Sequence, residues 1–362
     1  GVRGQAVQVE VHVGQGVRSL RGDPTRMSAG SVQNLIGVLP GRDRTRPALL
    51  VMSHYDTVAN SAGAADDTAG VAAALEIARL LKAGPPPERD VIFLFTDGEE
   101  AGLLGADAFF NTDPLAKRVG VVLNMEARGA AGRASMFETG PGSEGLIGLM
   151  AATLGTPNAM SLSSAVYHVL PNDTDFTHAV RHRLPGLNYA FLDDLPAYHT
   201  PLSTPARLDP GSLQDMGDQA GTMARVLATR ADLPRADATA STAYEDVLGL
   251  VFLHYPALVG WLILLVSAAA VLVTALRVRR AGRTTPMQVL RGLALFLSMG
   301  AATGLVLQVM GGVLGLLDYW GSLAVVGRSH TLITAELGAA IAVSVLLSGA
   351  AAAGRGRVGL RC

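Results

Sequence analysis

Five residues in separate parts of the chain carry side chains that zinc ions bind: His54, Asp66, Glu100, Glu126 and His199. Zinc prefers imidazole nitrogen and carboxylate oxygen where no thiolate is available, and two ions can share a bridging carboxylate. The only cysteine is Cys362, the last residue, so a thiolate site is excluded. Three carboxylates against two divalent ions leave a formal charge of about +1, which one hydroxide neutralises. The residue types therefore predict a pair of zinc ions.

The apolar run 48–56 (ALLVMSHYD) is typical of a buried strand that delivers polar residues at its carboxyl end. Open α/β sheets place their functional sites at this end of the strands. His54 and Asp56 are two residues apart, so they lie on one side of an extended backbone. We therefore expect Asp56 to orient the His54 ring from behind the metal.

A second apolar run, 90–100 (DVIFLFTDGEE), predicts a strand that ends in the adjacent acids Glu99 and Glu100. Because consecutive side chains diverge there, one acid can bind metal while the other faces the substrate as a general base. Between the two runs, the glycine-flanked loop 63–70 (GAADDTAG) opens onto a helical stretch. This loop can bring Asp66 between two metals.

Five motifs in order along the chain resemble the dinuclear-zinc aminopeptidases related to glutamate carboxypeptidase II: HYD, GAADDTAG, DGEEAGLLG, LNME and AYHT. The segments VLNMEARG, FETGPGSEGL, LPNDTDF and AYHTPLST are most similar to the membrane-anchored endoplasmic reticulum metallopeptidase branch and its bacterial relatives. The resemblance covers roughly residues 30–230. It implies an α/β fold of the zinc exopeptidase type, with a mixed, mostly parallel sheet sandwiched by helices.

The resemblance also implies a role for each site residue. His54 and Glu126 would hold one zinc ion, Glu100 and His199 would hold the other, and Asp66 would bridge the two. Glu99 would activate the bridging water, and Tyr198 is the best match for the tyrosine that stabilises the oxyanion; the alternative is that Tyr198 is only a packing aromatic.

Two further residues, Asp175 and Arg128, have two interpretations each. Asp175 either shapes the substrate pocket or caps the segment that follows it. Arg128 is either a clamp for a terminal carboxylate or part of a salt bridge behind Glu126.

The sequence departs from the family pattern in two places. Glu126 stands where many relatives have Asp, and one extra methylene can shift the spacing of the metals. After His199 the branch usually continues into an Asp-Thr pair, whereas this chain has Ser203 and Thr204. Because that Asp is not a metal ligand, the second departure bears on loop stability more than on catalysis.

The resemblance implies hydrolysis of peptide bonds by an exopeptidase. An aminopeptidase is favoured because most relatives with this ligand set are aminopeptidases, and because carboxylates near the metals can receive a free α-amine. A carboxypeptidase and a glutaminyl cyclase-like enzyme with a single zinc ion are alternatives. A non-catalytic membrane receptor of the same fold is another, but such a protein normally loses metal ligands and all five are present here. The net charge of −1 and the lack of a basic, aromatic-laced patch give no reason to expect nucleic acid as a partner.

The composition predicts a second, membrane-embedded region. Hydrophobic residues make up 49% of the chain and charged residues 16%, which is too apolar for an ordinary soluble enzyme. We expect a peptidase domain over 1–235, a juxtamembrane linker over 236–250 and a membrane domain over 251–362. Three apolar stretches in the last of these are long enough for transmembrane helices, at about 256–276, 292–317 and 331–353.

The distribution of arginine predicts the orientation in the bilayer. Five arginines separate the first and second apolar stretches, at positions 277, 279, 280, 283 and 291, and only Arg328 separates the second and third. Because positive residues stay in the cytoplasm, the peptidase domain is expected outside it. Nearly all of the 29 basic residues are arginine, which suggests a bacterium and hence a multi-pass protein of the bacterial plasma membrane. Gly1 stands where an initiator methionine is expected, so we expect the chain to be a fragment that lacks an upstream anchor.

Overall fold

The computed structural model describes residues 8–19, 27–168, 172–234 and 241–282, together with the single residues 285, 287, 288 and 298. The chain divides into two units, Gly1–Gly260 and Trp261–Cys362. The first unit contains a seven-stranded sheet in the order β1-β2-β4-β3-β5-β7-β6. Its strands are β1 (Gln8–Ser19), β2 (Met27–Leu39), β3 (Ala48–His54), β4 (Val91–Thr96), β5 (Val119–Ala127), β6 (Ser135–Thr139) and β7 (Gly186–Phe191).

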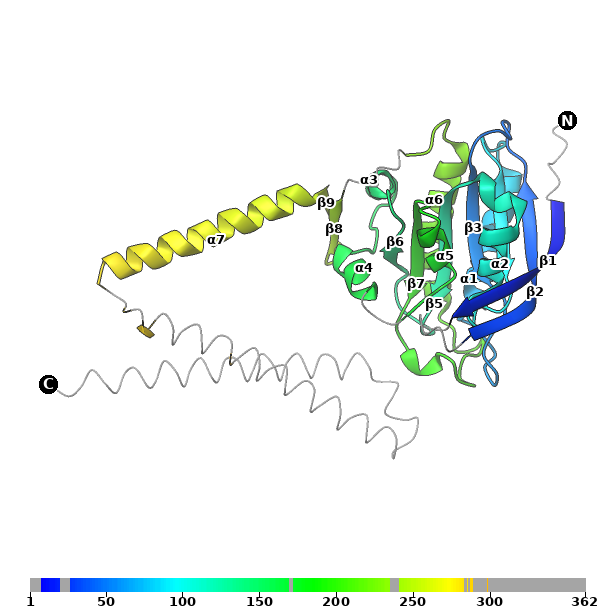
Figure 1. Cartoon of the computed structure of the whole chain (residues 1–362), viewed down its shortest axis with the longest axis horizontal. Helices are drawn as coiled ribbons and strands as arrows, with labels where there is room; N and C mark the ends of the chain where they lie inside the picture. Colours follow the sequence, from blue (N-terminus) through cyan, green and yellow to red (C-terminus); the bar gives the residue numbers. More distant parts are fainter. Residues whose placement is uncertain are drawn as a thin grey trace, which may run out of the picture. The chain divides into compact units, whose positions relative to one another are not determined.

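The four central strands, β4, β3, β5 and β7, run parallel, whereas β1, β2 and β6 at the two sides are antiparallel to their neighbours. Helices cover both faces of this sheet (Figure 1). They are α1 (Thr68–Ala83), α2 (Leu104–Thr112), α3 (Glu144–Thr153), α4 (Ser161–Tyr167), α5 (Phe176–Arg181) and α6 (Pro210–Thr229). The predicted α/β fold with a mixed sheet between helices is therefore confirmed.

Alternate residues of β3 explain why the strand is buried on both sides. Leu49 and Val51 pack in one core cluster with α1 and α6, while Leu50 and Met52 pack in a second cluster with α2 and α5. Since side chains of a strand alternate between the two faces of a sheet, a continuous apolar run is what a strand between two helical layers requires. The polar residue His54 comes at the strand's carboxyl end, as the sequence predicted.

The second predicted strand ends earlier than its sequence suggested. β4 ends at Thr96, so Glu99 and Glu100 lie in the turn after it. Gly98 in this turn has a φ of +68°, a conformation that glycine adopts without steric cost, and this takes the chain out of the strand. The acids are therefore held by a turn at the carboxyl edge of the sheet.

The predicted linker 236–250 contains a strand where the structure describes it. β8 (Thr242–Val247) pairs with β9 (Val251–Pro256) in a separate two-stranded sheet. Tyr244 of β8 is buried, and its carbonyl oxygen accepts a hydrogen bond from the Ser161 hydroxyl of α4 at 3.0 Å. The last residues before the apolar region thus belong to the folded unit.

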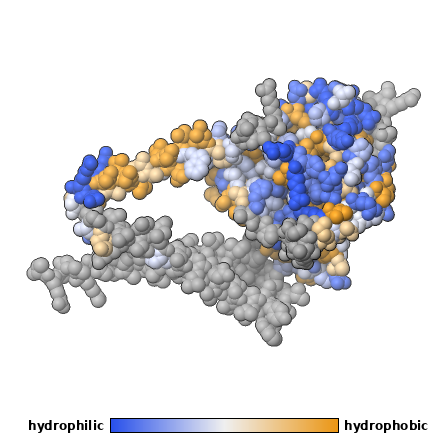
Figure 2. All heavy atoms as spheres, viewed as in Figure 1, coloured by the Kyte–Doolittle hydropathy of each residue, from blue (hydrophilic) through white to orange (hydrophobic). Residues whose placement is uncertain are grey.

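The apolar region begins with α7 (Ala257–Arg280), which is long and apolar enough to cross a bilayer. Figure 2 shows its apolar surface, which gives way to hydrophilic residues at the end where its last turn carries Arg277, Arg279 and Arg280. This helix falls on the predicted span 256–276. The other predicted spans, 292–317 and 331–353, lie outside the described residues apart from Ser298.

Candidate dinuclear metal site

The structure brings the five predicted ligands together at the carboxyl ends of the parallel strands. They come from the end of β3, the loop before α1, the turn after β4, the end of β5 and the loop after β7, in the order His54, Asp66, Glu100, Glu126 and His199. Because β4, β3, β5 and β7 are neighbours and parallel, the segments that follow them meet at one edge of the sheet. The fold therefore supplies the site with residues that are distant in the sequence.

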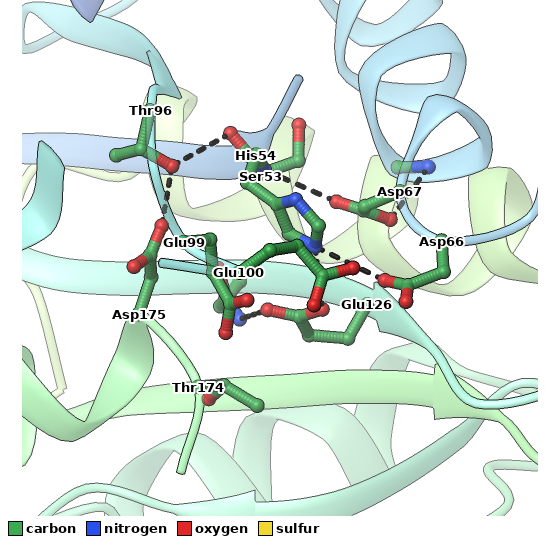
Figure 3. Close-up of polar contacts among 12 residues, drawn as sticks. Ser53, His54, Asp66, Asp67, Thr96, Glu99, Glu100, Glu126, Thr174 and Asp175 are labelled. Carbon is green, nitrogen blue, oxygen red and sulfur yellow. Dashed lines mark hydrogen bonds and ion pairs between the residues drawn. The ribbon is translucent and has the colours of Figure 1, made fainter. Parts of the chain in front are cut away.

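Asp66 lies between the two histidines. Its Oδ1 is 3.0 Å from Nε2 of His54, and its Oδ2 is 3.1 Å from Nε2 of His199. Nε2 of His54 is also 3.5 Å from Oε2 of Glu126, and Nε2 of His199 is 3.1 Å from Oε2 of Glu100. Figure 3 shows Asp66, Glu100 and Glu126 gathered around the His54 ring. Each histidine thus has its own glutamate and shares Asp66 with the other.

These distances fit a pair of zinc ions. Two ligands of one tetrahedral zinc ion lie about 3.3 Å apart, because each bond is about 2.0–2.1 Å long. The donors are imidazole and carboxylate, which zinc accepts readily. Oε1 of Glu100 is buried and has no hydrogen-bond partner among the described residues, which is costly for a carboxylate unless a cation is present. The donor set and this unsatisfied oxygen together favour bound cations.

The pKa shifts of the site residues also favour bound cations. Burial raises the pKa of Glu126, although the charge of His54 opposes this. Burial lowers the pKa of His54, but the charge of Glu126 and hydrogen bonds to Asp56 and Asp66 outweigh it and raise the pKa well above its usual value. In the same way, hydrogen bonds to Asp66 and Glu100 overcome burial and raise the pKa of His199 to about 9. The carboxylates therefore attract positive charge to the places where metal ions would sit.

Asp67 is a site residue that the motifs of the sequence did not single out. A carboxylate oxygen of Asp67 lies within 4.8 Å of ligand atoms of His54 and Glu126, so it is a possible ligand by distance. However, its Oδ2 accepts a hydrogen bond from the His54 backbone N–H at 3.2 Å, and its Oδ1 accepts one from the Gly70 N–H at 3.1 Å. Since both oxygens are occupied, Asp67 positions His54 and begins α1, and Asp66 is the better ligand.

Asp56 connects His54 at the end of β3 to the turn after β4 that carries Glu99 and Glu100. Its Oδ1 accepts a hydrogen bond from the Glu99 N–H at 3.0 Å, and its Oδ2 accepts one from the Glu100 N–H at 3.1 Å. Oδ1 also lies 3.5 Å from Nδ1 of His54, the ring nitrogen that faces away from Asp66. The residue thus lies behind His54, as expected, and in addition fixes the backbone of both glutamates.

Glu99 lies beside the ligands and in neither metal-binding group. It lines a cavity of about 890 Å³ together with Asp66, Glu100, Glu126 and His199. Burial raises the pKa of Glu99 well above its usual value; the charge of His54 opposes this, and those of Glu126 and Asp175 add to it. A carboxyl group with a raised pKa at the edge of a substrate cavity has the properties of a general base that must also return a proton.

Tyr198 and Arg128 form one wall of the same cavity. The Tyr198 ring stacks on the His199 ring with centroids 3.7 Å apart, and the Arg128 guanidinium lies 5.4 Å from the Tyr198 centroid. Burial, aided by the charges of Asp66 and Glu100, raises the pKa of Tyr198, so its hydroxyl keeps its proton and can donate a hydrogen bond. Tyr198 therefore packs on His199 and lines the cavity, and its hydroxyl makes no hydrogen bond among the described residues.

Asp175 does not line the cavity, and its side chain does not cap α5. It is fully buried beneath the site, where it accepts a hydrogen bond from the Thr96 hydroxyl (Figure 3). Burial raises its pKa to about 7. Its neighbour Asp173 lines the cavity instead.

The loop that carries His199 is held in place by its backbone. His199 itself has a φ of +58°, in the left-handed region that costs a non-glycine residue free energy. The Ser203 carbonyl oxygen accepts a hydrogen bond from the Ala64 N–H at 3.2 Å, which joins this loop to the loop before Asp66. Ser203 itself is buried.

Comparison with known proteins gives a consistent set of similarities. The profile of peptidase family M28 matches residues 34–224. Endoplasmic reticulum metallopeptidase 1 of Mus musculus is 33% identical over 239 residues, which are 64% of this chain and 27% of that protein. A vacuolar membrane protease of Candida albicans is 37% identical over 185 residues, covering 51% of this chain and 22% of that protein. The chain spans about a quarter of the length of these relatives.

Among solved structures, the aminopeptidase from Aneurinibacillus sp. strain AM-1 is similar with a TM-score of 0.46 and 20% identity, covering 58% of this chain and 51% of that one. A glutaminyl cyclase from an Acidobacteriales bacterium is similar with a TM-score of 0.45 and 20% identity, covering 61% of this chain and 79% of that one.

Proposed function

Because the chain belongs to peptidase family M28, we propose that it is a membrane-anchored dizinc exopeptidase that removes single residues from the amino ends of peptides. One observation carries the proposal: Asp66 lies between His54 and His199 at 3.0 and 3.1 Å, with the unliganded acid Glu99 beside it in one cavity. A carboxylate that two metal ions could share, next to an acid outside both metal-binding groups, suits hydrolysis of an amide bond by two metals and a general base.

The ligands would divide between two ions as their distances suggest. His54 and Glu126 would hold one zinc ion, Glu100 and His199 would hold the other, and Asp66 would contact both. Zinc ions bound in this way supply Lewis acidity, which polarises a carbonyl group and makes water a stronger acid.

The chain's own residues then handle the protons and the developing charge. Glu99 takes a proton from the attacking water and returns it to the leaving amine, so the peptide C–N bond is replaced by a carboxyl group and a free amine. The Tyr198 hydroxyl, protonated at neutral pH, donates a hydrogen bond to the carbonyl oxygen as that oxygen becomes negative.

We propose cleavage from the amino end of the peptide because carboxylates are in excess around the metal-binding residues. Any carboxylate oxygen that is not committed to a metal attracts the cationic α-amine of a peptide. The competing choice is a carboxypeptidase, in which Arg128 would bind the terminal carboxylate. Arg128 is exposed and lies over the Tyr198 ring, and this contact gives it a role that does not involve substrate.

A hexapeptide with modified ends tests the proposal. We expect the free peptide and its carboxyl-amidated form to be shortened from the amino end, while the amino-acetylated form is not cleaved. Mass spectrometry of the products over time measures this. Cleavage of the acetylated peptide at the rate of the free one, with no cleavage of the amidated peptide, would instead identify a carboxypeptidase and make Arg128 the residue to replace.

Membrane anchoring is proposed from α7 and the arginines that follow its apolar stretch. If these arginines are cytoplasmic, the peptidase domain lies on the other side of the membrane. In the bacterial plasma membrane, we expect a reporter fused after Arg283 to score as cytoplasmic and one fused near Gly321 to score as exported. The reverse pattern would place the peptidase domain in the cytoplasm.

A further inference from the structure

One charged residue in the catalytic cavity has no part in the proposed chemistry. Arg18 of β1 lines the same cavity as Glu99 and the metal-binding residues, and it is only 7% exposed. It lies upstream of residues 34–224, the part that matches the family profile. The hairpin of β1 and β2 therefore adds a cation to a site whose other residues come from the family's own fold.

The sequence before Arg18 explains how a strand at the edge of the sheet reaches the cavity. Gly14 and Gly16 face α2, and a Cβ atom on Gly14 would lie 2.7 Å from the Cβ of Ala108. On Gly16 it would collide with the backbone of Leu104, so only glycine allows β1 to lie flat on the helix. Arg18 is the next residue on this face, at the amino end of α2.

A second contact fixes the strand at the same place. The Val17 N–H donates a hydrogen bond to Oδ2 of Asp107 in α2 at 3.1 Å. The turn that precedes α2 carries Glu99 and Glu100, so the end of β1 is adjacent to the segment that forms the site. Backbone contacts between β1 and α2 thus fix the position of Arg18, which belongs to a strand and not to a surface loop.

The guanidinium of Arg18 is only partly satisfied. Its Nη2 contacts Oδ2 of Asp173, which also lines the cavity and is 35% exposed. Its Nε is buried and has no hydrogen-bond partner among the described residues. Arginine presents its donors in a planar fork that matches a carboxylate, and a buried donor without an acceptor is unfavourable. Because Arg18 lines the cavity and Asp173 is the acid that contacts it among the described residues, the guanidinium can receive a second carboxylate from a bound substrate.

We propose that Arg18 binds a carboxylate of the peptide substrate and so makes the enzyme selective for peptides that carry one. The inference rests on the proposed function, because it assumes that a peptide occupies the cavity. The carboxylate belongs either to an acidic side chain or to the carboxyl end of a short peptide. Asp173 holds the guanidinium in place from the other side, as a carboxylate partner does for a binding arginine.

Two pairs of tripeptides distinguish these sources. In the first pair, Glu is exchanged for Gln next to the amino-terminal residue while the carboxyl end is amidated. In the second pair, the Gln peptide has either a free or an amidated carboxyl end. For the parent enzyme, we expect kcat/KM to be about tenfold or more higher for the carboxylate peptide in one of the two pairs, mainly because KM is lower. Equal kcat/KM within both pairs would overturn the proposal.

Replacement of the arginine then tests the residue itself. Arg18→Gln should lower kcat/KM for the preferred carboxylate peptide by about 10- to 100-fold and leave the neutral peptide within a few-fold. Arg18→Lys keeps the charge but loses the planar set of guanidinium donors. Its kcat/KM for the preferred carboxylate peptide should therefore lie between those of Arg18→Gln and the parent. Equal losses for the charged and neutral peptides would mean that Arg18 only supports the fold.

The matched control is Arg44→Gln. Arg44 also pairs with an acid, in its case the buried Asp90, but it does not line the cavity, and Arg118 keeps Asp90 paired at 2.7 Å. This variant should keep the parent's preference for the carboxylate peptide. Thermal unfolding of all three variants shows whether each is folded.

Failure of the proposed exopeptidase function can be distinguished from failure of the proposal for Arg18. If the parent cleaves none of the three tripeptides, the exopeptidase assignment fails, and calorimetric titration with the same pairs still measures carboxylate binding. Tighter binding of the carboxylate peptide to the parent than to Arg18→Gln would support the role of Arg18 without any turnover. Equal binding would refute it.

Discussion

Replacing Glu99 by Gln is expected to lower kcat by at least about 10²-fold while the metals stay bound, because the amide cannot accept the proton of the attacking water. The fold should persist, since backbone groups hold Glu99: its N–H donates to Asp56 and its carbonyl oxygen accepts from Gly102 and Leu103, while its side chain makes no hydrogen bond among the described residues. Turnover of a chromogenic aminoacyl substrate and zinc analysis of the same preparation measure the two quantities together.

Glu100→Gln is the matched control for this result. Glu100 is the neighbouring acid, its N–H is bonded to the same Asp56, and its Oε2 lies 3.1 Å from Nε2 of His199. This variant should lose zinc as well as activity. If it retains the parent's zinc content while Glu99→Gln loses metal, the two glutamates have exchanged roles. A Glu99→Gln enzyme that works within a few-fold of the parent would exclude Glu99 as the base.

The second large effect is expected for Asp66→Asn, which keeps the shape of the side chain but removes its charge and one anionic oxygen. Asp66 contacts both histidines, so the change weakens both metal positions at once. Loss of a group that only orients a ligand typically costs about 10- to 100-fold in metal affinity or activity, and loss of a shared ligand should exceed this. We expect fewer than two zinc ions per chain and activity reduced by more than about 10²-fold.

Asp67→Asn separates ligation from positioning. Asn is as good a helix cap as Asp, and its carbonyl oxygen can still accept one of the two backbone hydrogen bonds that Asp67 accepts. This variant should keep its zinc and lose mainly thermal stability. If zinc is lost from Asp67→Asn and retained in Asp66→Asn, Asp67 is the ligand.

The central strands and the place of the site were readable from the sequence because their residues follow simple rules. The run that forms β3 is apolar on both faces and turns polar at His54, which identifies a buried parallel strand and its functional end. The spacing of His54 and Asp56 likewise predicted a pair on one side of the backbone, and Asp56 lies 3.5 Å from Nδ1 of the ring. These features are local, so no knowledge of distant contacts was needed.

Features that depend on distant contacts could not be read in this way. Nothing near Asp175 in the sequence shows that Thr96 will bond to it beneath the site, and nothing near Asp67 shows that its second oxygen will hold the His54 backbone. The exposed edge strand β1 is a similar case, because the importance of Gly16 appears only when α2 lies against it. β8 was hidden by small and polar residues that are equally typical of a linker.

The dispersal of the ligands over the sheet has a consequence for the order of folding. The candidate ligands of one ion extend from His54 to Glu126, and those of the other extend from Asp66 to His199, which comes only after β7, the last parallel strand to be made. Pairing between strands far apart in sequence must first overcome the entropy of closing long loops, so a competent site appears late. Metal uptake would therefore follow assembly of the sheet, and bound zinc would then stabilise the finished domain by mass action. The zinc supply in the compartment where the domain folds thus governs how much of the chain becomes active.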